Sequence, residues 1–415
     1  MNYKLSKLFF EREINNTIVL EAHATGEKIE LFEDAFLSEY RDIKLNKGTN
    51  TISTELEKAL HSRNILVDEN FDDESYIDGR IKFTEDNLFS LIILPTEQCN
   101  LRCSYCYEDF KNKDLSDEHY DLLLKEIESQ ILNDNKTIIH IGWFGGEPTL
   151  KLDKVLWFNN KIIELTNNNN AEFSSHITTN GTLLNQENFA RMIDARIDNF
   201  QVTIDGHHHD EQRAFADGSG SFDIIYNNIE NMLKTDYEFT LMIRVNVASS
   251  EFKPEFYELF NEFKHDERVG FRINPVFSSN GVEIQSIKEN RAGALSQREY
   301  IKEAGFPLIE ERNTKLLKDS CYATCKSSFV VRADGTLAKC TVALYNPLNA
   351  VGYLCEKNNK IEVDEKMHEA WVAKRVDAKC RSCDKFASCY NRGCPLSFVN
   401  NKDRKHYCEE IVNHA

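Results

Sequence analysis

Cys99-Asn100-Leu101-Arg102-Cys103-Ser104-Tyr105-Cys106 is a stretch that places three thiols within eight residues, at the spacing Cys-x-x-x-Cys-x-x-Cys. It follows the apolar run Phe89–Leu94, which is typical of a buried strand and ends at Pro95. The thiols therefore lie just past a predicted strand, where α/β proteins place their sites. An iron–sulfur cluster ordinarily takes four thiolates, so three would leave one iron open to a substrate or cofactor.

The alternative for these cysteines is a structural role, either buried or bound to zinc. Zinc sites usually combine cysteine pairs two to four residues apart and need a fourth ligand. The stretch supplies three thiols and no fourth ligand, so it favours an iron–sulfur cluster.

Length and composition narrow the class of protein. The 415 residues, 41 % of them hydrophobic, are enough for two or three domains. No apolar run is long enough for a membrane span, and the N-terminus lacks the apolar core of a signal peptide, which predicts a cytoplasmic protein. Twelve cysteines there favour metal or redox chemistry over disulfides. The net charge of −18 argues against nucleic acid as a partner.

Residues 1–80 contain no cysteine and read as a small α+β unit. Three short strands are expected at Leu8–Phe10, Thr17–Glu21 and Lys28–Phe32, the last two forming a hairpin around Gly26. Polar helical stretches follow at Glu33–Arg41 and Thr54–Arg63.

Strand and helix patterns alternate from about residue 85, which predicts a parallel sheet with right-handed crossovers. The expected strands are Phe89–Leu94, Thr137–Phe144, Phe173–Thr178, Phe200–Ile204, Phe239–Val247 and Gly270–Val276. The expected helices are Ser116–Leu132, Leu152–Asn167, Gln186–Asp194, Phe222–Lys234 and Glu251–Lys264. Periodicity alone does not distinguish an open sheet from a partial barrel.

Polar residues cluster at the ends of these strands. Gly145-Gly146-Glu147-Pro148 ends the second strand; paired glycines permit close approach of a ligand, and the carboxylate can hold an ammonium. Thr178-Thr179-Asn180-Gly181 ends the third, and Thr203-Ile204-Asp205-Gly206 ends the fourth, with Arg213 beyond it. Asn-Gly and Asp-Gly are also plain turn signals. His207-His208-His209 is interpreted as loop residues, because adjacent side chains rarely bind one ion.

The last hundred residues are rich in cysteine, which in a reducing compartment indicates a metal framework. Ser328–Val331 and Asp334-Gly335 predict a strand and a hairpin turn before Cys340. Two zinc ribbons are the general expectation from such pairs. The cysteines of this region are Cys321, Cys325, Cys340, Cys355, Cys380, Cys383, Cys389, Cys394 and Cys408.

Taken together, the three-cysteine stretch and the Gly-Gly-Glu-Pro segment resemble the radical S-adenosylmethionine (radical SAM) enzymes. The resemblance implies a partial (β/α)6 barrel at 85–280, with Cys99, Cys103 and Cys106 holding a catalytic [4Fe-4S] cluster. It implies that the open iron binds SAM and that reduction yields a 5′-deoxyadenosyl radical. The SAM contacts that it assigns are Tyr105, Gly145, Gly146, Glu147, Thr178, Asn180, Thr203, Asp205 and Arg213.

The C-terminal cysteines resemble a SPASM domain, which would span 319–415 after a bridge at 281–318. The resemblance implies two auxiliary [4Fe-4S] clusters, hence three in all. Cys321, Cys325, Cys340 and Cys394 would hold one, and Cys380, Cys383, Cys389 and Cys408 the other. The chain departs from the family pattern by one extra residue between Cys389 and Cys394. Cys355 is left over and is interpreted as a small hydrophobic residue.

The resemblance implies an oxidoreductase that modifies a ribosomally made peptide by a thioether or carbon–carbon crosslink. Residues 1–80 resemble a leader-peptide recognition element, with a packing cap as the alternative, and flavodoxin or ferredoxin is the expected electron donor. An anaerobic sulfatase maturase is the second hypothesis, although Thr341 stands where that family has an aspartate base. A non-catalytic iron–sulfur carrier is the third, and a carrier has no need of the Gly-Gly-Glu-Pro segment.

Overall fold

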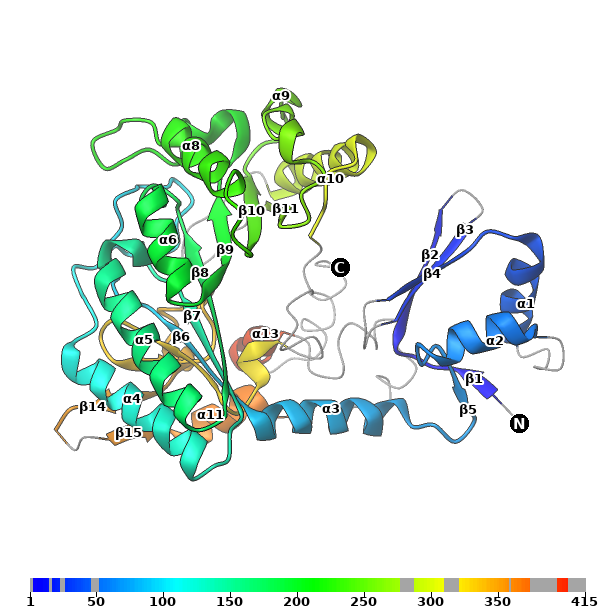
Figure 1. Ribbon diagram of the computed structural model, residues 1–415, viewed down its shortest axis with the longest axis horizontal. Helices are drawn as coiled ribbons and strands as arrows, with labels where there is room; N and C mark the ends of the chain where they lie inside the picture. The colour runs from blue at the N-terminus through cyan, green and yellow to red at the C-terminus, as the bar shows by residue number, and fades with distance from the viewer. Residues whose placement is uncertain are drawn as a thin grey trace. The chain divides into compact units, whose positions relative to one another are not determined.

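The structure is a computed structural model that describes residues 3–14, 17–22, 27–45, 52–276, 287–309, 321–357, 360–373 and 394–401. The chain divides into two compact units (Figure 1). One contains residues 1–85, 312–325 and 371–415, and the other contains residues 86–311 and 326–370. Each is described by itself.

The first unit begins with a small α+β arrangement, as the sequence predicts. Strands β2, β3 and β4 form an antiparallel sheet in that order, and β1 pairs with β5. The elements are β1 (Tyr3–Leu5), β2 (Phe9–Ile14), β3 (Thr17–Ala22), β4 (Lys28–Leu31), α1 (Asp34–Lys44), α2 (Thr54–His61) and β5 (Leu66–Asp68). Alternate residues of β3, among them Ile18 and Leu20, are buried against Leu37 and Tyr40 of α1. The predicted hairpin and both helices are confirmed.

Six parallel strands form the centre of the second unit, paired in the order β11-β10-β9-β8-β7-β6. They are β6 (Leu88–Ile93), β7 (Ile138–Trp143), β8 (Glu172–Thr179), β9 (Ile197–Thr203), β10 (Thr240–Val247) and β11 (Val269–Pro275). Each matches a predicted strand to within a few residues. Helices run along the outside of this curved sheet (Figure 1). This is the expected partial barrel of six β/α units.

Four of the predicted helices are confirmed: α4 (Asp117–Leu132), α5 (Leu152–Asn168), α6 (Gln186–Asp194) and α8 (Phe222–Leu233). Ser116 caps α4, because its hydroxyl accepts a hydrogen bond from the His119 amide at 3.1 Å.

The prediction of one helix at Glu251–Lys264 is wrong. The structure has a single turn α9 (Glu255–Glu258) and a 3-10 turn η3 (Asn261–Phe263). Pro254 stands at the N-cap of α9, and a proline disfavours helical backbone in the residue before it. Phe256, Tyr257 and Phe263 are buried in this segment, so packing rather than helix propensity sets its path.

Both edges of the barrel sheet are extended by later parts of the chain. β12 (Ser328–Val331) pairs in parallel with β6, and β13 (Thr336–Ala338), β14 (Ala350–Cys355) and β15 (Lys360–Val363) continue the sheet in antiparallel order. At the opposite edge, Phe271 of β11 exchanges backbone hydrogen bonds with Pro307 and Ile309. The predicted hairpin before Cys340 is confirmed as β12 and β13, which turn at Gly335 with φ of 83°.

The helices α3 (Asp73–Asn87), α10 (Ile287–Ala304), α11 (Glu365–Val372) and α13 (Pro395–Asn401) complete the described elements. Helix α3 is not predicted from the sequence; it begins inside the acidic run DENFDDE, and acidic residues in a first turn favour a helix N-terminus. α10 lies in the segment interpreted as a bridge. Among the described residues, no helix has the length and apolar character needed to span a bilayer.

Candidate active site at the carboxyl ends of the barrel strands

The three-cysteine loop leaves β6 and is pinned by a second loop. The Arg102 amide donates to the Ala214 carbonyl at 2.8 Å, and the Ser104 amide donates to the Gln212 carbonyl at 2.9 Å. Leu101, fully buried, forms a β-bridge with Phe215. The loop is therefore fixed in place by the same segment that carries Arg213.

The three thiols are partly buried, and their surroundings suit an iron–sulfur cluster. The Cys99 sulfur accepts from the Leu101 amide at 3.4 Å and from the Asn180 side-chain amide at 3.7 Å, and such bonds stabilise cluster thiolates. Burial raises the pKa of Cys99 and of Cys106 to about 12, so without a metal these thiols stay protonated. Iron would provide the positive charge that favours the thiolate.

Within the part of the chain that the structure describes, no three His, Cys, Asp or Glu side chains converge closely enough for a single metal ion. A [4Fe-4S] cluster differs from a single ion because each thiolate binds its own iron.

The paired glycines bring the end of β7 against the backbone that leads into the cysteine loop. A side chain at Gly146 would lie 2.2 Å from the Gln98 carbonyl oxygen, and one at Gly145 would lie 2.6 Å from the Thr96 carbonyl oxygen. The Glu147 amide donates to the Gln98 carbonyl at 2.8 Å. The two glycines are therefore needed to place Glu147 next to the cysteine loop. The sequence alone does not show this requirement.

Glu147 is fully buried and is the centre of a hydrogen-bond network. Its Oε1 accepts from the Thr149 amide at 3.0 Å, the Thr149 hydroxyl at 2.5 Å and the Thr179 hydroxyl at 2.6 Å. Its Oε2 accepts from the Asn180 amide at 2.7 Å and keeps capacity for a further donor, such as an ammonium. Burial raises the pKa of Glu147, while these hydrogen bonds oppose that shift.

Asn180 joins this network to the cysteine loop. Its side-chain amide donates to the side-chain oxygen of Asn100 at 2.7 Å as well as to the Cys99 sulfur, and its own oxygen accepts from Thr182. Thr179, rather than the predicted Thr178, bonds Glu147. Because side chains alternate along a strand, Thr178 lies on the opposite face of β8. The Thr-Thr-Asn-Gly segment and the Gly-Gly-Glu-Pro segment therefore meet beside Cys99.

A second network brings together Tyr105, Asp205 and Arg213. The Tyr105 hydroxyl donates to Asp205 and accepts from Arg213 Nη1 at 2.9 Å and from the Asn246 side-chain amide at 3.0 Å. Asp205 Oδ1 also accepts from the Asn246 backbone amide at 2.9 Å. Asn246 was missed by the sequence analysis, because an asparagine near a strand end carries no distinctive signal.

The three consecutive histidines have separate roles. His207 and His208 lie in a short turn, η2 (Gly206–His208), and His208 pairs with Glu211 at 3.0 Å. His209 is 1 % exposed; its Nδ1 accepts from the Asp205 amide at 3.0 Å and its Nε2 bonds the Ser221 hydroxyl at 2.9 Å. The prediction that all three histidines are loop residues is therefore wrong in two respects. It misses the 3-10 turn, and it misses that His209 positions Asp205 by accepting a hydrogen bond from its backbone amide.

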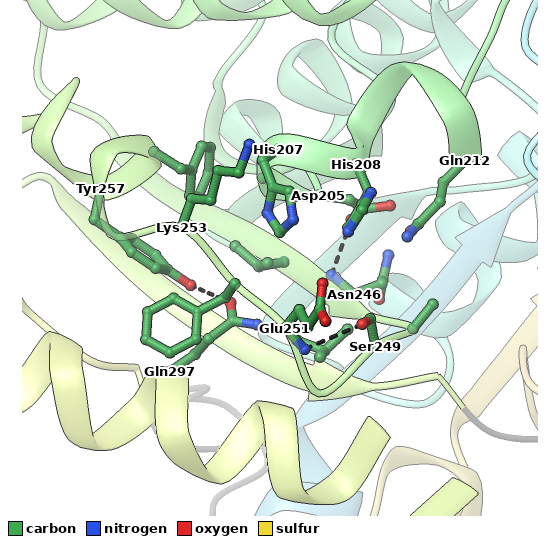
Figure 2. A pocket seen from close by; sticks show the side chains of 16 residues that line it. Asp205, His207, His208, Gln212, Asn246, Ser249, Glu251, Lys253, Tyr257 and Gln297 are labelled. Carbon is green, nitrogen blue, oxygen red and sulfur yellow. Dashed lines mark hydrogen bonds between the residues drawn. The ribbon is translucent and has the colours of Figure 1, made fainter. Parts of the chain in front are cut away.

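A pocket opens beside Asp205 at the ends of β9 and β10. Figure 2 shows His207, Lys253 and Tyr257 around it, and the Tyr257 hydroxyl donates to Gln297 at 2.5 Å. Aromatic and polar side chains thus line the same pocket, as is usual for small-molecule sites.

Two buried acidic residues, which no motif in the sequence singles out, flank the cysteine loop along the chain. Glu97 is fully buried and accepts from Arg332 Nη2 at 2.8 Å. Glu108 is 8 % exposed, and burial, with the charges of Glu97 and Glu147, raises its pKa to about 8. Arg332 follows β12, so the residues after β12 supply the cation that balances Glu97.

A histidine pair lies on the inner face of β7 and β8. His140 Nε2 and His176 Nδ1 are 2.9 Å apart, and His140 Nδ1 bonds the Ser174 hydroxyl at 2.8 Å. Gly142 makes room for this pair, because a side chain there would lie 2.3 Å from the His176 ring. Burial lowers the pKa of His140 to about 3 and that of His176 to about 4.

The pair predicts a loss of stability in acid. In the unfolded chain both imidazoles bind protons below about pH 6.5, whereas in the folded chain they stay neutral. The free energy of unfolding should therefore fall as the pH drops from about 6.5 to about 4, by roughly 1–3 kcal/mol from the pair. Urea unfolding of the wild type and of His176→Gln across this range measures the effect. A variant as acid-sensitive as the wild type would contradict it.

The C-terminal cysteines are described only in part. Cys325 is buried, Cys340 is half-buried, and Cys321 and Cys394 are exposed. Asn349, fully buried, pins the loop at Cys340 by accepting from its amide at 3.0 Å and donating to its carbonyl at 2.8 Å. Cys355, interpreted as a small hydrophobic residue, is half-buried at the end of β14. The predicted ligands Cys380, Cys383, Cys389 and Cys408 lie outside the described residues.

Comparison with known proteins agrees with this geometry. Residues 93–247 match the Radical SAM superfamily. A cysteine-type anaerobic sulfatase-maturating enzyme of Clostridium novyi (strain NT) is 25 % identical over 362 residues, which are 78 % of this chain and 93 % of that protein.

Two solved structures share the fold. The structure of anSMEcpe with bound AdoMet and the Cp18Cys peptide has a TM-score of 0.56 at 20 % identity and covers 78 % of this chain and 95 % of that one. Streptococcus suis SuiB bound to the precursor peptide SuiA has a TM-score of 0.53 at 16 % identity and covers 98 % of both chains. With the cysteine loop and both networks at the strand ends, residues 93–247 are therefore a radical SAM domain.

Proposed function

We propose that this chain is a radical SAM maturase that modifies a side chain of a ribosomally made precursor peptide, by a thioether or a carbon–carbon crosslink. The observation that carries the proposal is the extent of the fold: SuiB, solved with its precursor peptide, is matched over 98 % of both chains. The match to anSMEcpe leaves part of this chain uncovered.

The residues of the site support the binding of a cluster and SAM. Cys99, Cys103 and Cys106 would hold the [4Fe-4S] cluster, Glu147 the SAM amino group, and Arg213 and Asp205 its carboxylate and ribose. The pocket beside Asp205 lies next to the residue that would contact the ribose (Figure 2). When bound together, the cluster and SAM would supply one-electron cleavage of SAM and a radical that abstracts hydrogen. The remaining cysteines other than Cys355, including those outside the described residues, would hold two auxiliary clusters, and a flavodoxin or ferredoxin would donate electrons.

Mass spectrometry of the product tests the proposal. Reconstituted protein with SAM, a reductant and the chain's precursor peptide should yield a peptide that has lost two hydrogens and kept every other atom. Fragmentation should then locate the new bond. An unmodified precursor, despite peptide-dependent SAM cleavage, would contradict the proposal.

Sulfatase maturation is the second candidate, and the Clostridium novyi relative favours it. In that reaction a cysteine becomes formylglycine, so sulfur is lost and oxygen is gained. Thr341 argues against it, because a hydroxyl is a weak base near neutral pH. A sulfatase-derived cysteine peptide in the same assay separates the two reactions by their products.

The N-terminal sheet is proposed to bind the leader of the precursor as an added strand. In the ladder between β3 and β4 the Ala22 amide donates to the Glu27 carbonyl, so alternate residue pairs exchange hydrogen bonds. The Lys28 and Glu30 amides therefore point away from β3, at an edge that no other described strand pairs with. Phe32, 67 % exposed at the end of β4, adds an apolar contact for a leader.

Replacing Glu30 by proline should weaken precursor binding about tenfold or more, because it removes an outward amide without breaking the β3–β4 ladder. Glu30→Ala is the matched control and should bind as the wild type does. Fluorescence anisotropy of a labelled precursor measures both. SAM cleavage without peptide should be the same in all three proteins. Equal precursor affinity in the proline variant would leave this edge as a structural cap.

A further inference from the structure

The inner face of β10 and β11 carries two arginines side by side. Arg244 and Arg272 are directly paired in register, and the next pair on the same face is Asn246 and Asn274. The residues between them, such as Phe271, pack outward against Tyr257, Phe260 and Phe306. Because side chains alternate along a strand, the arginines point to the opposite face, which is the concave side of the barrel.

Arg244 forms no salt bridge in the described structure, and the nearby anion that attracts it, Asp205, is already bonded to Tyr105 and to the Asn246 amide. Arg244 Nε donates to the Asn246 side-chain oxygen at 2.8 Å, and among the described residues no group accepts from its two terminal nitrogens. Burial, followed by repulsion from Arg272, lowers the pKa of Arg244. An arginine placed there is held at a cost in free energy unless an anion arrives to bind it.

Asn274 is a second group without a partner. It is 7 % exposed, and its side-chain oxygen has no hydrogen-bond partner. A buried amide oxygen of this kind is normally satisfied, so an unsatisfied one opposite Asn246, on the same face as Arg244, points to a ligand with its own polar groups. A peptide has such groups in its main chain, next to any carboxylate it carries.

Arg244 reaches the network of Tyr105, Asp205 and Arg213 through Asn246, so the case for a separate anion rests on its distance from Glu147 and on Arg213 serving the SAM carboxylate. In SAM the carboxylate and the amino group share one carbon, and the amino group is assigned to Glu147 after β7. Three strand spacings lie between β7 and β10 in the sheet, which is about 14 Å along it. Arg213, bonded to Tyr105 of the cysteine loop, is the cation assigned to the SAM carboxylate.

We propose that Arg244, with Arg272 and Asn274, is a carboxylate site that recognises an acidic side chain or the C-terminal carboxylate of the substrate peptide. The proposal rests on the proposed function as a peptide maturase and adds a feature of the substrate. A guanidinium binds a carboxylate through two parallel hydrogen bonds, so the site would also orient the peptide inside the barrel.

Binding of short peptides to the reconstituted, SAM-saturated full-length protein tests the site without turnover. The probes are acetyl-Gly-Asp-Gly-amide, its Asn counterpart, and acetyl-Gly-Gly-Gly with a free C-terminus, each measured by saturation-transfer NMR. The wild type should bind at least one carboxylate probe about tenfold more tightly than the Asn peptide. The two acidic probes distinguish a side-chain carboxylate from a terminal one.

Variants then assign the preference to Arg244. Arg244→Gln should abolish the preference, and Arg244→Lys should restore part of it, because lysine keeps the charge and loses the paired donors. Arg291→Gln, an exposed position on α10, is the matched control and should keep the full preference. Iron content and the affinity for decarboxylated SAM show whether each variant is folded.

Two results would overturn the proposal. One is a wild type that binds acidic and neutral probes equally, a result that needs no variant. The other is an Arg244→Gln variant that binds SAM more weakly but decarboxylated SAM unchanged, which would assign the arginine to SAM itself. Neither result depends on product formation. A failure of peptide maturation would instead appear as an unmodified precursor, while the probe preference would stand.

Discussion

Replacing Cys99, Cys103 and Cys106 together by alanine should remove about four of about twelve irons and abolish SAM cleavage, because each cluster takes four irons by the thiolate count. The three thiols lie on one loop, and the Cys99 sulfur already accepts two hydrogen bonds from nitrogen donors. The remaining irons should stay if the C-terminal cysteines hold their own clusters. Iron analysis and the release of 5′-deoxyadenosine with dithionite measure the two effects.

Cys355→Ala is the matched control, since that thiol belongs to none of the predicted ligand sets. It should keep the full iron content and the full rate of SAM cleavage. Zinc bound tightly by the C-terminal cysteines would contradict the count of three clusters. Loss of all iron in the triple variant would mean that the clusters do not assemble independently.

Replacing Glu147 by alanine should lower SAM affinity by about 2 kcal/mol or more, roughly thirtyfold. The change removes the proposed partner of the SAM amino group. It also leaves the Thr179 hydroxyl and the Asn180 amide without their acceptor in a fully buried position. Calorimetry with SAM on the reconstituted protein measures the affinity, and iron content shows whether the cluster survives.

Two further variants separate these effects. Glu147→Gln keeps the size but sets an amide group against donors, so its affinity should fall nearly as far. Thr149→Val removes one donor and keeps the carboxylate, so SAM affinity should change little. Unchanged SAM affinity in Glu147→Ala would remove Glu147 from the SAM site.

The strands of the barrel were predictable because each is a short apolar run bounded by turn residues. The positions of Glu147, Asn180 and Asp205 at one end of the sheet follow, since parallel strands present their carboxyl ends at one edge. That Thr179 rather than Thr178 bonds Glu147 depends on which face of β8 is buried, and two adjacent threonines do not reveal it.

Other parts of the site depend on contacts that are distant in sequence. Glu97 and Arg332 meet across 235 positions, and nothing near either residue signals the other. The pairing of Arg244 with Arg272 is likewise a matter of strand register. The helix predicted at Glu251–Lys264 is absent for a similar reason. Its apolar residues recur with a helical period, but the burial of its aromatic side chains against distant parts of the chain decides the backbone conformation.

The pairing of β6 with β12 has a consequence for how the chain folds during synthesis. Phe89 and Leu91 lie in one of the first strands of the barrel to leave the ribosome, whereas their neighbour Phe329 is made about 240 residues later. Synthesis at roughly 5–20 residues per second leaves the β6 edge unpaired for about 12 s or longer. An unpaired apolar edge recruits other strands, so the nascent chain is open to aggregation during that interval. Chains that end before residue 328 keep this edge permanently exposed and should accumulate in the insoluble fraction.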